Sequence, residues 1–277
     1  MTTAVPHAEV SVMNDLFAID IIKYSFLTGL ILSVLCGFLS FFIVEKKLSF
    51  LTVAVSHSAF GALALALLIN FNRDAILYIF CFSVALIVFE IKKRTVIEFE
   101  TILGIFFAFT MALGIIFLKF SNNGAFDLNA TLFGSVVSST KSDLIKTAFI
   151  GILIFAVYFL FFKDIIFTLF DEDVAKVSGI NTNFINYIIL FSITLVIVTG
   201  IKIIGIILLT AFMTIPASIA LNFTSSYRAT ILVSTILSLI IFTGSFFLAY
   251  FYDLPPGATT VVVGTIIFTL VHIIKSN

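Results

Sequence analysis

The chain alternates between long apolar runs and short polar connections. Each run holds about 20 residues, the number that an α-helix needs to cross about 30 Å of hydrocarbon. The runs lack the regular alternation of polar residues that the strands of a membrane barrel require, so they predict helices. Nine such runs follow one another, at 21–44, 50–70, 75–91, 101–119, 144–162, 183–200, 203–222, 229–250 and 258–274.

The connection between the runs at 183–200 and 203–222 is unusually short. It holds Lys202 between Gly200 and Gly205, a pattern that suits a sharp reversal or a broken helix. The pattern therefore predicts an all-α, polytopic membrane bundle with 8–9 transmembrane helices.

The composition agrees with a membrane protein. Only 11% of the residues are charged and 61% are hydrophobic, with a mean hydropathy of +1.25, whereas a soluble domain carries about 25% charged residues. Membrane lipid is therefore the expected surrounding of most of the chain. The 15 basic and 15 acidic residues balance, which indicates no nucleic acid or other strongly charged partner. Cys36 and Cys81 have no neighbours at metal-ligand or redox spacing and are interpreted as packing residues.

Basic residues in the connections set the orientation in the membrane. Placing "EKK" (45–47) and "IKKR" (91–94) in the cytoplasm puts nine basic residues inside and six outside. With nine spans, residues 1–19 form an extracytoplasmic N-terminal segment without the pattern of a cleaved signal peptide. Residues 20–277 then form a single transmembrane domain that ends in the cytoplasm.

Two absences bear on the function class. No Asp or Glu lies in the middle of a run, whereas ion-driven transporters usually carry an intramembrane carboxylate. The chain also lacks the G-x-x-x-x-G-K-[ST] pattern of a nucleotide-binding P-loop. We therefore expect no enzymatic activity in this chain, and any uphill transport would draw its energy from a separate polypeptide.

The longest cytoplasmic connection, about 163–181, predicts a short helix outside the membrane. Asp171, Glu172 and Asp173 suit the N-terminus of such a helix, and Gly179 suits its C-terminal end. A short helix presented between two spans has the shape that docks into a partner ATPase. The alternative interpretation is an ordinary solvated connection.

His57 is a titratable residue within the apolar stretch "FLTVAVSHSAFGALALA" (50–66). Small residues recur beside it at four-residue spacing, which lets helices approach closely and could bring a second imidazole near from a symmetric partner. Two imidazoles are too few for a closed zinc site, but a permeation site has to release its ion. The alternative is a histidine that merely hydrogen-bonds a neighbouring carbonyl or serine. The small residues are Ala54, Ser58, Ala62 and Ala66.

Six segments in order resemble the membrane subunit of bacterial ATP-binding-cassette importers for zinc, manganese or iron, the ABC-3 type of metal permease. Together they extend over nearly all of residues 20–275. They are "SHSAFGALAL" (56–65), "FETILGIFFAFTMALGI" (99–115), "LFGSVVSSTKSDL" (132–144), "FDEDVAKVSGI" (170–180), "GIKIIGIILLTAFMTIPASIAL" (200–221) and "FYDLPPGATTVVV" (251–263).

The resemblance implies a permease in the cytoplasmic (inner) membrane of a bacterium. It implies a homodimer that works with two copies of an ABC ATPase, which bind the ATP, and with an extracytoplasmic metal-binding protein. The chain itself would bind no cofactor and would pass a divalent metal ion. The region from Ala175 to Gly179 would contact the ATPase, and His57 would line the metal path. Pro216 would free a backbone carbonyl and kink its helix, so that the carbonyl could face the path.

The sequence departs from the family pattern at one position. Family members usually carry Asp-x-x-x-His in the second span, but Val53 stands four residues before His57. Loss of the carboxylate should disfavour manganese, which prefers oxygen ligands, more than zinc. Two alternatives therefore stay open: the same scaffold with a non-metal or chelated cargo, and a membrane scaffold protein that transports nothing.

Overall fold

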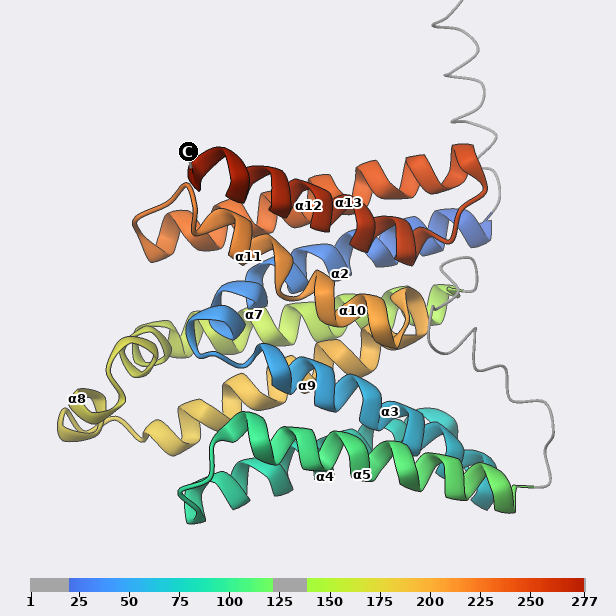
Figure 1. Cartoon of the computed structure of the whole chain (residues 1–277), viewed down its shortest axis with the longest axis horizontal. Coiled ribbons are helices and arrows are strands. Elements are labelled where there is room, and N and C mark those ends of the chain that lie inside the picture. Colours follow the sequence, from blue (N-terminus) through green and yellow to red (C-terminus); the bar gives the residue numbers. More distant parts are fainter. Residues whose placement is uncertain (1–19, 122–138, 277) are drawn as a thin grey trace, which may run out of the picture.

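The computed structural model describes residues 20–121 and 139–276, and these residues form helices and connecting turns with no strand among them (Figure 1). The expected extracytoplasmic segment 1–19 lies outside the described residues, as does most of "LFGSVVSSTKSDL". The helices are α2 (Asp20–Glu45), α3 (Ser49–Ile69), α4 (Arg73–Arg94), α5 (Phe99–Phe120), α7 (Lys141–Phe170), α8 (Glu172–Val177), α9 (Thr182–Ile204), α10 (Ile206–Phe212), α11 (Ile215–Ala220), α12 (Tyr227–Tyr252) and α13 (Pro256–Ser276).

Within the described ranges, eight helices are long and apolar enough to cross a membrane. The predicted run at 203–222 is not one of them, because it is divided into the short helices α10 and α11. Gly205 separates α9 from α10 at a φ of +91°, a conformation that suits glycine. The chain then turns at Met213–Thr214, and Pro216 lies in the first turn of α11, where a missing N–H is tolerated. The predicted single span is thus a broken pair of helices.

The broken pair nevertheless brings the chain back across the bundle. In Figure 1, α8 and the C-terminus lie at the same end of the bundle, opposite the start of α2. At that end the Lys275 ammonium donates to the backbone carbonyl of Asn222, which follows α11. The two termini of the described bundle therefore lie on opposite sides, as nine passages require, although only eight are continuous helices.

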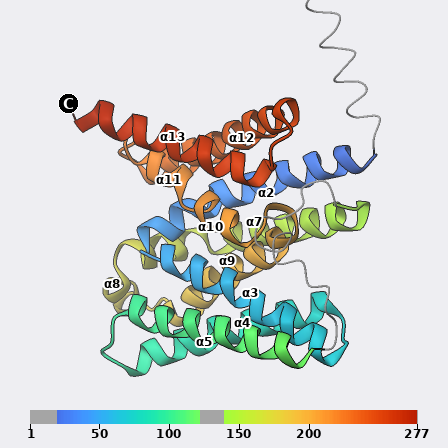
Figure 2. The ribbon, with the colours of Figure 1, turned by 45° about the vertical axis from the view of Figure 1, so that its right-hand side comes forward.

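Helix α2 occupies the centre and packs closely against α12 (Figure 2). The backbones approach at Gly37, where an added Cβ would lie 2.7 Å from the Thr235 Cα. Hydroxyls of α12 bridge the contact, because Ser234 donates to the Gly37 carbonyl at 2.8 Å and Ser238 donates to the Ser33 carbonyl at 2.7 Å. Small residues and interhelical hydrogen bonds of this kind hold helices together in lipid, where the hydrophobic effect between them is weak.

Helix α3 packs against α5 on one side and α4 on another, and it also contacts α9 and α10. Its small residues Ala54, Ser58, Ala62 and Ala66 are all buried. The Ser58 hydroxyl reaches the Cys81 sulfur of α4 at 3.6 Å. The predicted close-packing stripe is therefore real, but it is buried within the subunit.

Candidate translocation and coupling sites

His57 lies on the half-buried side of α3, next to the stripe of small residues. Its Nδ1 is 2.9 Å from the Val53 carbonyl oxygen, one turn earlier in the same helix. Its ring meets the Phe107 ring of α5 edge-on, with centroids 4.9 Å apart. When Nδ1–H donates to a carbonyl, the lone pair of Nε2 is left to bind an ion. His57 therefore makes the hydrogen bond to a neighbouring carbonyl that the alternative interpretation expected. The same geometry also suits a metal ligand.

A cavity of about 390 Å³ opens one turn before His57, towards the start of α3. Three elements line it: the first turns of α3, the start of α5 and the break between α10 and α11. Its polar groups are hydroxyls and the Glu100 carboxylate. The lining residues are Ser49, Phe50, Thr52, Val53, Glu100, Thr210, Ala211 and Thr214.

No three His, Cys, Asp or Glu side chains of the described ranges gather into a group that could hold a metal ion. The residues that line the cavity include no histidine, and His57 lies one turn after the lining residue Val53 in α3. Pro216 is buried and does not line the cavity, whereas Thr214, at the break, does.

The break between α10 and α11 is bridged by a residue that the sequence analysis did not single out. The buried hydroxyl of Ser40 in α2 accepts a hydrogen bond from the Ala217 N–H at 3.0 Å. The same hydroxyl donates to the Thr214 carbonyl oxygen at 3.4 Å. Backbone groups at helix ends need such partners, above all in lipid. Ser40 stands within an apolar run like many other serines, so the sequence carried no signal for this role.

The predicted short helix is present as α8, which begins after Asp171 as expected. The preceding span, predicted to end at 162, is longer than expected, because α7 continues through Phe170. Asp171 caps it by accepting from the Val174 N–H at 2.9 Å. Gly179 follows at a φ of +85°, and its N–H donates to the Lys176 carbonyl at 3.0 Å, which ends the helix. Ala175 is fully buried and fixes the inner face of α8 to the bundle.

The outer face of α8 is apolar in part. Val177 is 90% exposed and Val174 is 47% exposed, although both lie outside the spans. The Asp173 side chain is exposed and forms an ion pair with Lys176 at 3.6 Å. An exposed valine pair on a short helix outside the spans suits contact with another protein.

Glu172 connects α8 to two other elements. Its carboxylate lies 3.9 Å from the Lys46 ammonium after α2, 3.3 Å from the Asn186 amide of α9 and 3.2 Å from Lys176. Lys46 also donates to the Asn186 carbonyl oxygen. Burial by itself would raise the pKa of Glu172, but the contacts with Lys176, Lys46 and Asn186 hold this pKa below its ordinary value. Burial lowers the pKa of Lys46, against the attraction of Glu172.

The sequence analysis did not identify Lys46 and Asn186 as partners of Glu172. The only signal for them is polarity at the edge of an apolar run, which many surface residues share.

The sequence model of the ABC 3 transport family matches residues 18–275, nearly the whole chain. The chain belongs to the ABC 3 transport family. This finding and the eight candidate spans confirm the expected multi-pass membrane permease.

The chain is also similar to metal permeases of known name. The manganese transport system membrane protein MntC of Listeria monocytogenes is 30% identical over 259 residues, which cover 91% of this chain and 92% of the relative. The high-affinity zinc uptake system membrane protein ZnuB of Haemophilus influenzae is 26% identical over 251 residues, covering 91% and 96%.

Solved structures show the same fold. PsaBC from Streptococcus pneumoniae in complex with Fab matches with a TM-score of 0.83 at 26% identity, covering 95% of this chain and 94% of that one. An inward-facing putative metal-chelate type ABC transporter matches with a TM-score of 0.67 at 19% identity, covering 90% and 85%, and supports the fold alone.

Proposed function

We propose that this chain is the permease subunit of an ATP-driven importer for a divalent metal ion in a bacterial cytoplasmic membrane. It works as a homodimer with a separate ABC ATPase and an extracytoplasmic metal-binding protein. The observation that carries the proposal is His57, whose Nδ1 bonds the Val53 carbonyl so that Nε2 is left for an ion, one turn after the cavity residue Val53. The named activities of the manganese and zinc relatives support the class of cargo.

The number of ligands supports the proposed homodimer. One subunit brings a single imidazole, whereas two symmetric subunits bring two imidazoles to a shared path. An incomplete coordination shell suits a conduit, because the ion has to leave as well as enter. Imidazole is a good ligand for zinc, and we expect zinc to be transported in preference to manganese.

A second candidate is a permease for a chelated metal. It is favoured by the apolar side chain of Val53, which lines the cavity one turn from His57 and cannot ligate a bare ion.

The test is uptake of radioactive zinc and manganese into vesicles that hold the chain with its ATPase and its binding protein. We expect ATP-dependent zinc uptake that falls at least tenfold in His57→Ala, while His272→Ala, on the exposed end of α13, leaves it unchanged. Uptake that His57→Ala does not alter would make this histidine a packing residue. ATP hydrolysis without uptake of either ion would favour the chelate.

The role of α8 has its own test. Val177→Glu places a charge on the most exposed apolar position of α8, and we expect it to reduce co-purification of the ATPase. Val96→Glu is the matched control, because Val96 is fully exposed in the cytoplasmic connection between α4 and α5. Equal co-purification from the two variants would show that α8 is an ordinary connection.

A further inference from the structure

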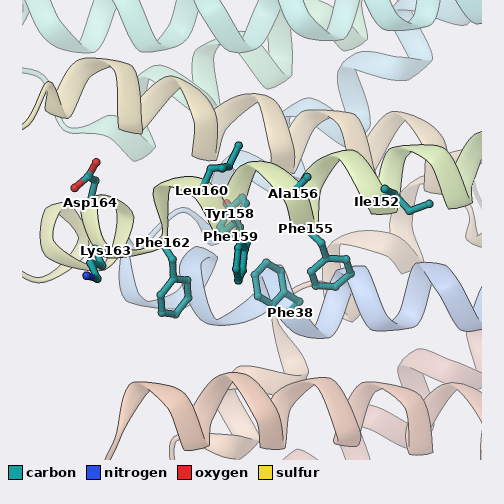
Figure 3. Close-up of a pocket in the computed structure, with 10 residues that line it drawn as sticks. All are labelled: Phe38, Ile152, Phe155, Ala156, Tyr158, Phe159, Leu160, Phe162, Lys163 and Asp164. Atoms are coloured by element: carbon teal, nitrogen blue, oxygen red, sulfur yellow. The ribbon is translucent and has the colours of Figure 1, made fainter.

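A large hollow lies away from His57, along α7. It is a groove of about 1100 Å³ between α7 and α2, with apolar rings along most of its length (Figure 3). Figure 3 shows the rings of Phe155, Phe159 and Phe162 pointing to the same side of α7, towards Phe38 of α2. At one end the groove is bounded by Lys163 and Asp164.

The groove exists because α2 packs against both α7 and α12, while α7 and α12 hardly touch each other. They meet through Tyr227, whose ring centroid lies 6.3 Å from that of Phe162 and 6.2 Å from that of Phe170. This contact limits the groove near the cytoplasmic end. The groove is open along the side formed by Phe159 and Leu160, because Phe159 is 86% exposed and Leu160 is 74% exposed.

The length of the groove matches one leaflet of a bilayer. From Ile152 to Leu160, before α7 kinks at Phe161, the helix rises about 12 Å at 1.5 Å per residue, a little less than half of the roughly 30 Å hydrocarbon thickness. Lys141, at the outer start of α7, lies about 29 Å from Leu160 along the helix, and Lys163 follows directly after the kink. Because this straight part of α7 is about as long as the hydrocarbon is thick, we expect the groove to extend from near the middle of the membrane to its cytoplasmic surface and Lys163 to lie at the depth of lipid phosphates.

Lys163 has no ion pair with any residue that the structure describes. In Figure 3 its side chain lies on the side of the rings, while the Asp164 carboxylate points away from them. An uncompensated ammonium at the end of an aromatic groove complements an acyl chain that ends in a phosphate. A groove that accepted a protein helix would not need a cation at the level of the headgroups.

We propose that this groove is a binding site for one phospholipid of the cytoplasmic leaflet. Its acyl chain lies on Phe38, Phe155 and Phe159, and its phosphate contacts Lys163. The site prefers an anionic phospholipid over a zwitterionic one.

The absence of tryptophan from the chain makes a direct test possible. Phe155→Trp places a single fluorophore in the groove. Leu153→Trp is the matched control, because Leu153 is 46% exposed on the same helix, does not line the groove and lies about 3 Å away in depth. Each variant is reconstituted with its ATPase in phosphatidylcholine vesicles, and brominated phosphatidylglycerol is added in increasing proportion.

We expect half-maximal quenching of Phe155→Trp at a mole fraction about fivefold lower than for Leu153→Trp, since one lysine near a bilayer surface confers about that preference. Adding Lys163→Gln should remove the difference, whereas adding Arg94→Gln, an exposed cytoplasmic cation, should keep it. Identical quenching curves would show that the groove holds only exchanging bulk lipid. No quenching of Phe155→Trp would show that another protein surface covers the groove. Either result overturns the proposal.

Discussion

The contact between α3 and α5 should control both stability and the position of His57, and Gly61→Ala tests it. A Cβ on Gly61 would lie 2.8 Å from the backbone carbonyl oxygen of Thr110 in α5. The two backbones would have to separate by about 0.6 Å to reach the 3.4 Å of ordinary van der Waals contact. A backbone atom cannot rotate away as a side chain can, so we expect a steric cost of about 2–3 kcal/mol.

Replacing a helical glycine by alanine also favours the helix by about 0.5–1 kcal/mol. We therefore expect Gly61→Ala to lower the free energy of unfolding by about 1–2.5 kcal/mol. Gly104→Ala is the control on the same pair of helices, because its added Cβ would lie 3.9 Å from the Phe50 ring. That variant should retain the propensity gain and match or exceed the stability of the parent chain.

The assay is unfolding by SDS in mixed micelles, followed by far-ultraviolet circular dichroism. The gain in helix propensity is common to both variants and cancels when their free energies of unfolding are subtracted. The difference that remains is the steric cost at Gly61. Zinc uptake should also fall in Gly61→Ala, since the separation of α3 from α5 moves His57 relative to Phe107. Equal stability of the two variants would refute the close approach of α3 and α5.

Two further predictions concern polar contacts. Ser40→Ala leaves the buried Ala217 N–H without its partner and should lower the free energy of unfolding by about 1–3 kcal/mol. Ser25→Ala should be neutral in the same assay, because the buried Ser25 hydroxyl has no hydrogen-bond partner among the described residues; a loss equal to that of Ser40→Ala would contradict the bridging role. The lowered pKa of Glu172 means that its contacts stabilise α8 above its ordinary pKa of 4.5 and are lost as the pH falls through the lower folded value. Proteolysis of the α8 region should therefore increase below pH 4.5 in the parent chain. Glu172→Gln should show the increased cleavage already at neutral pH. A cleavage rate of the parent chain that stays independent of pH would exclude this linkage.

The amino-acid sequence determined the helices of this protein more closely than their arrangement. The length of an apolar run is set by the thickness of the bilayer, and capping is local, so the spans and the ends of α8 could be predicted from neighbouring residues. The run at 203–222 was predicted less well. Its apolarity indicated one span, whereas the turn at Met213–Thr214 is stabilised from outside by Ser40 of α2.

Only the tertiary structure decided which polar residues act together. Glu172 meets Lys46 and Asn186 through contacts between segments that are far apart in the sequence. The cavity one turn from His57 requires α3, α5 and α10 to converge, and the groove along α7 requires that α7 and α12 share α2 without packing on each other. These arrangements depend on how closely pairs of helices approach. That approach is set by small residues and hydroxyls facing each other across helices, and a single sequence does not show which residues will face each other.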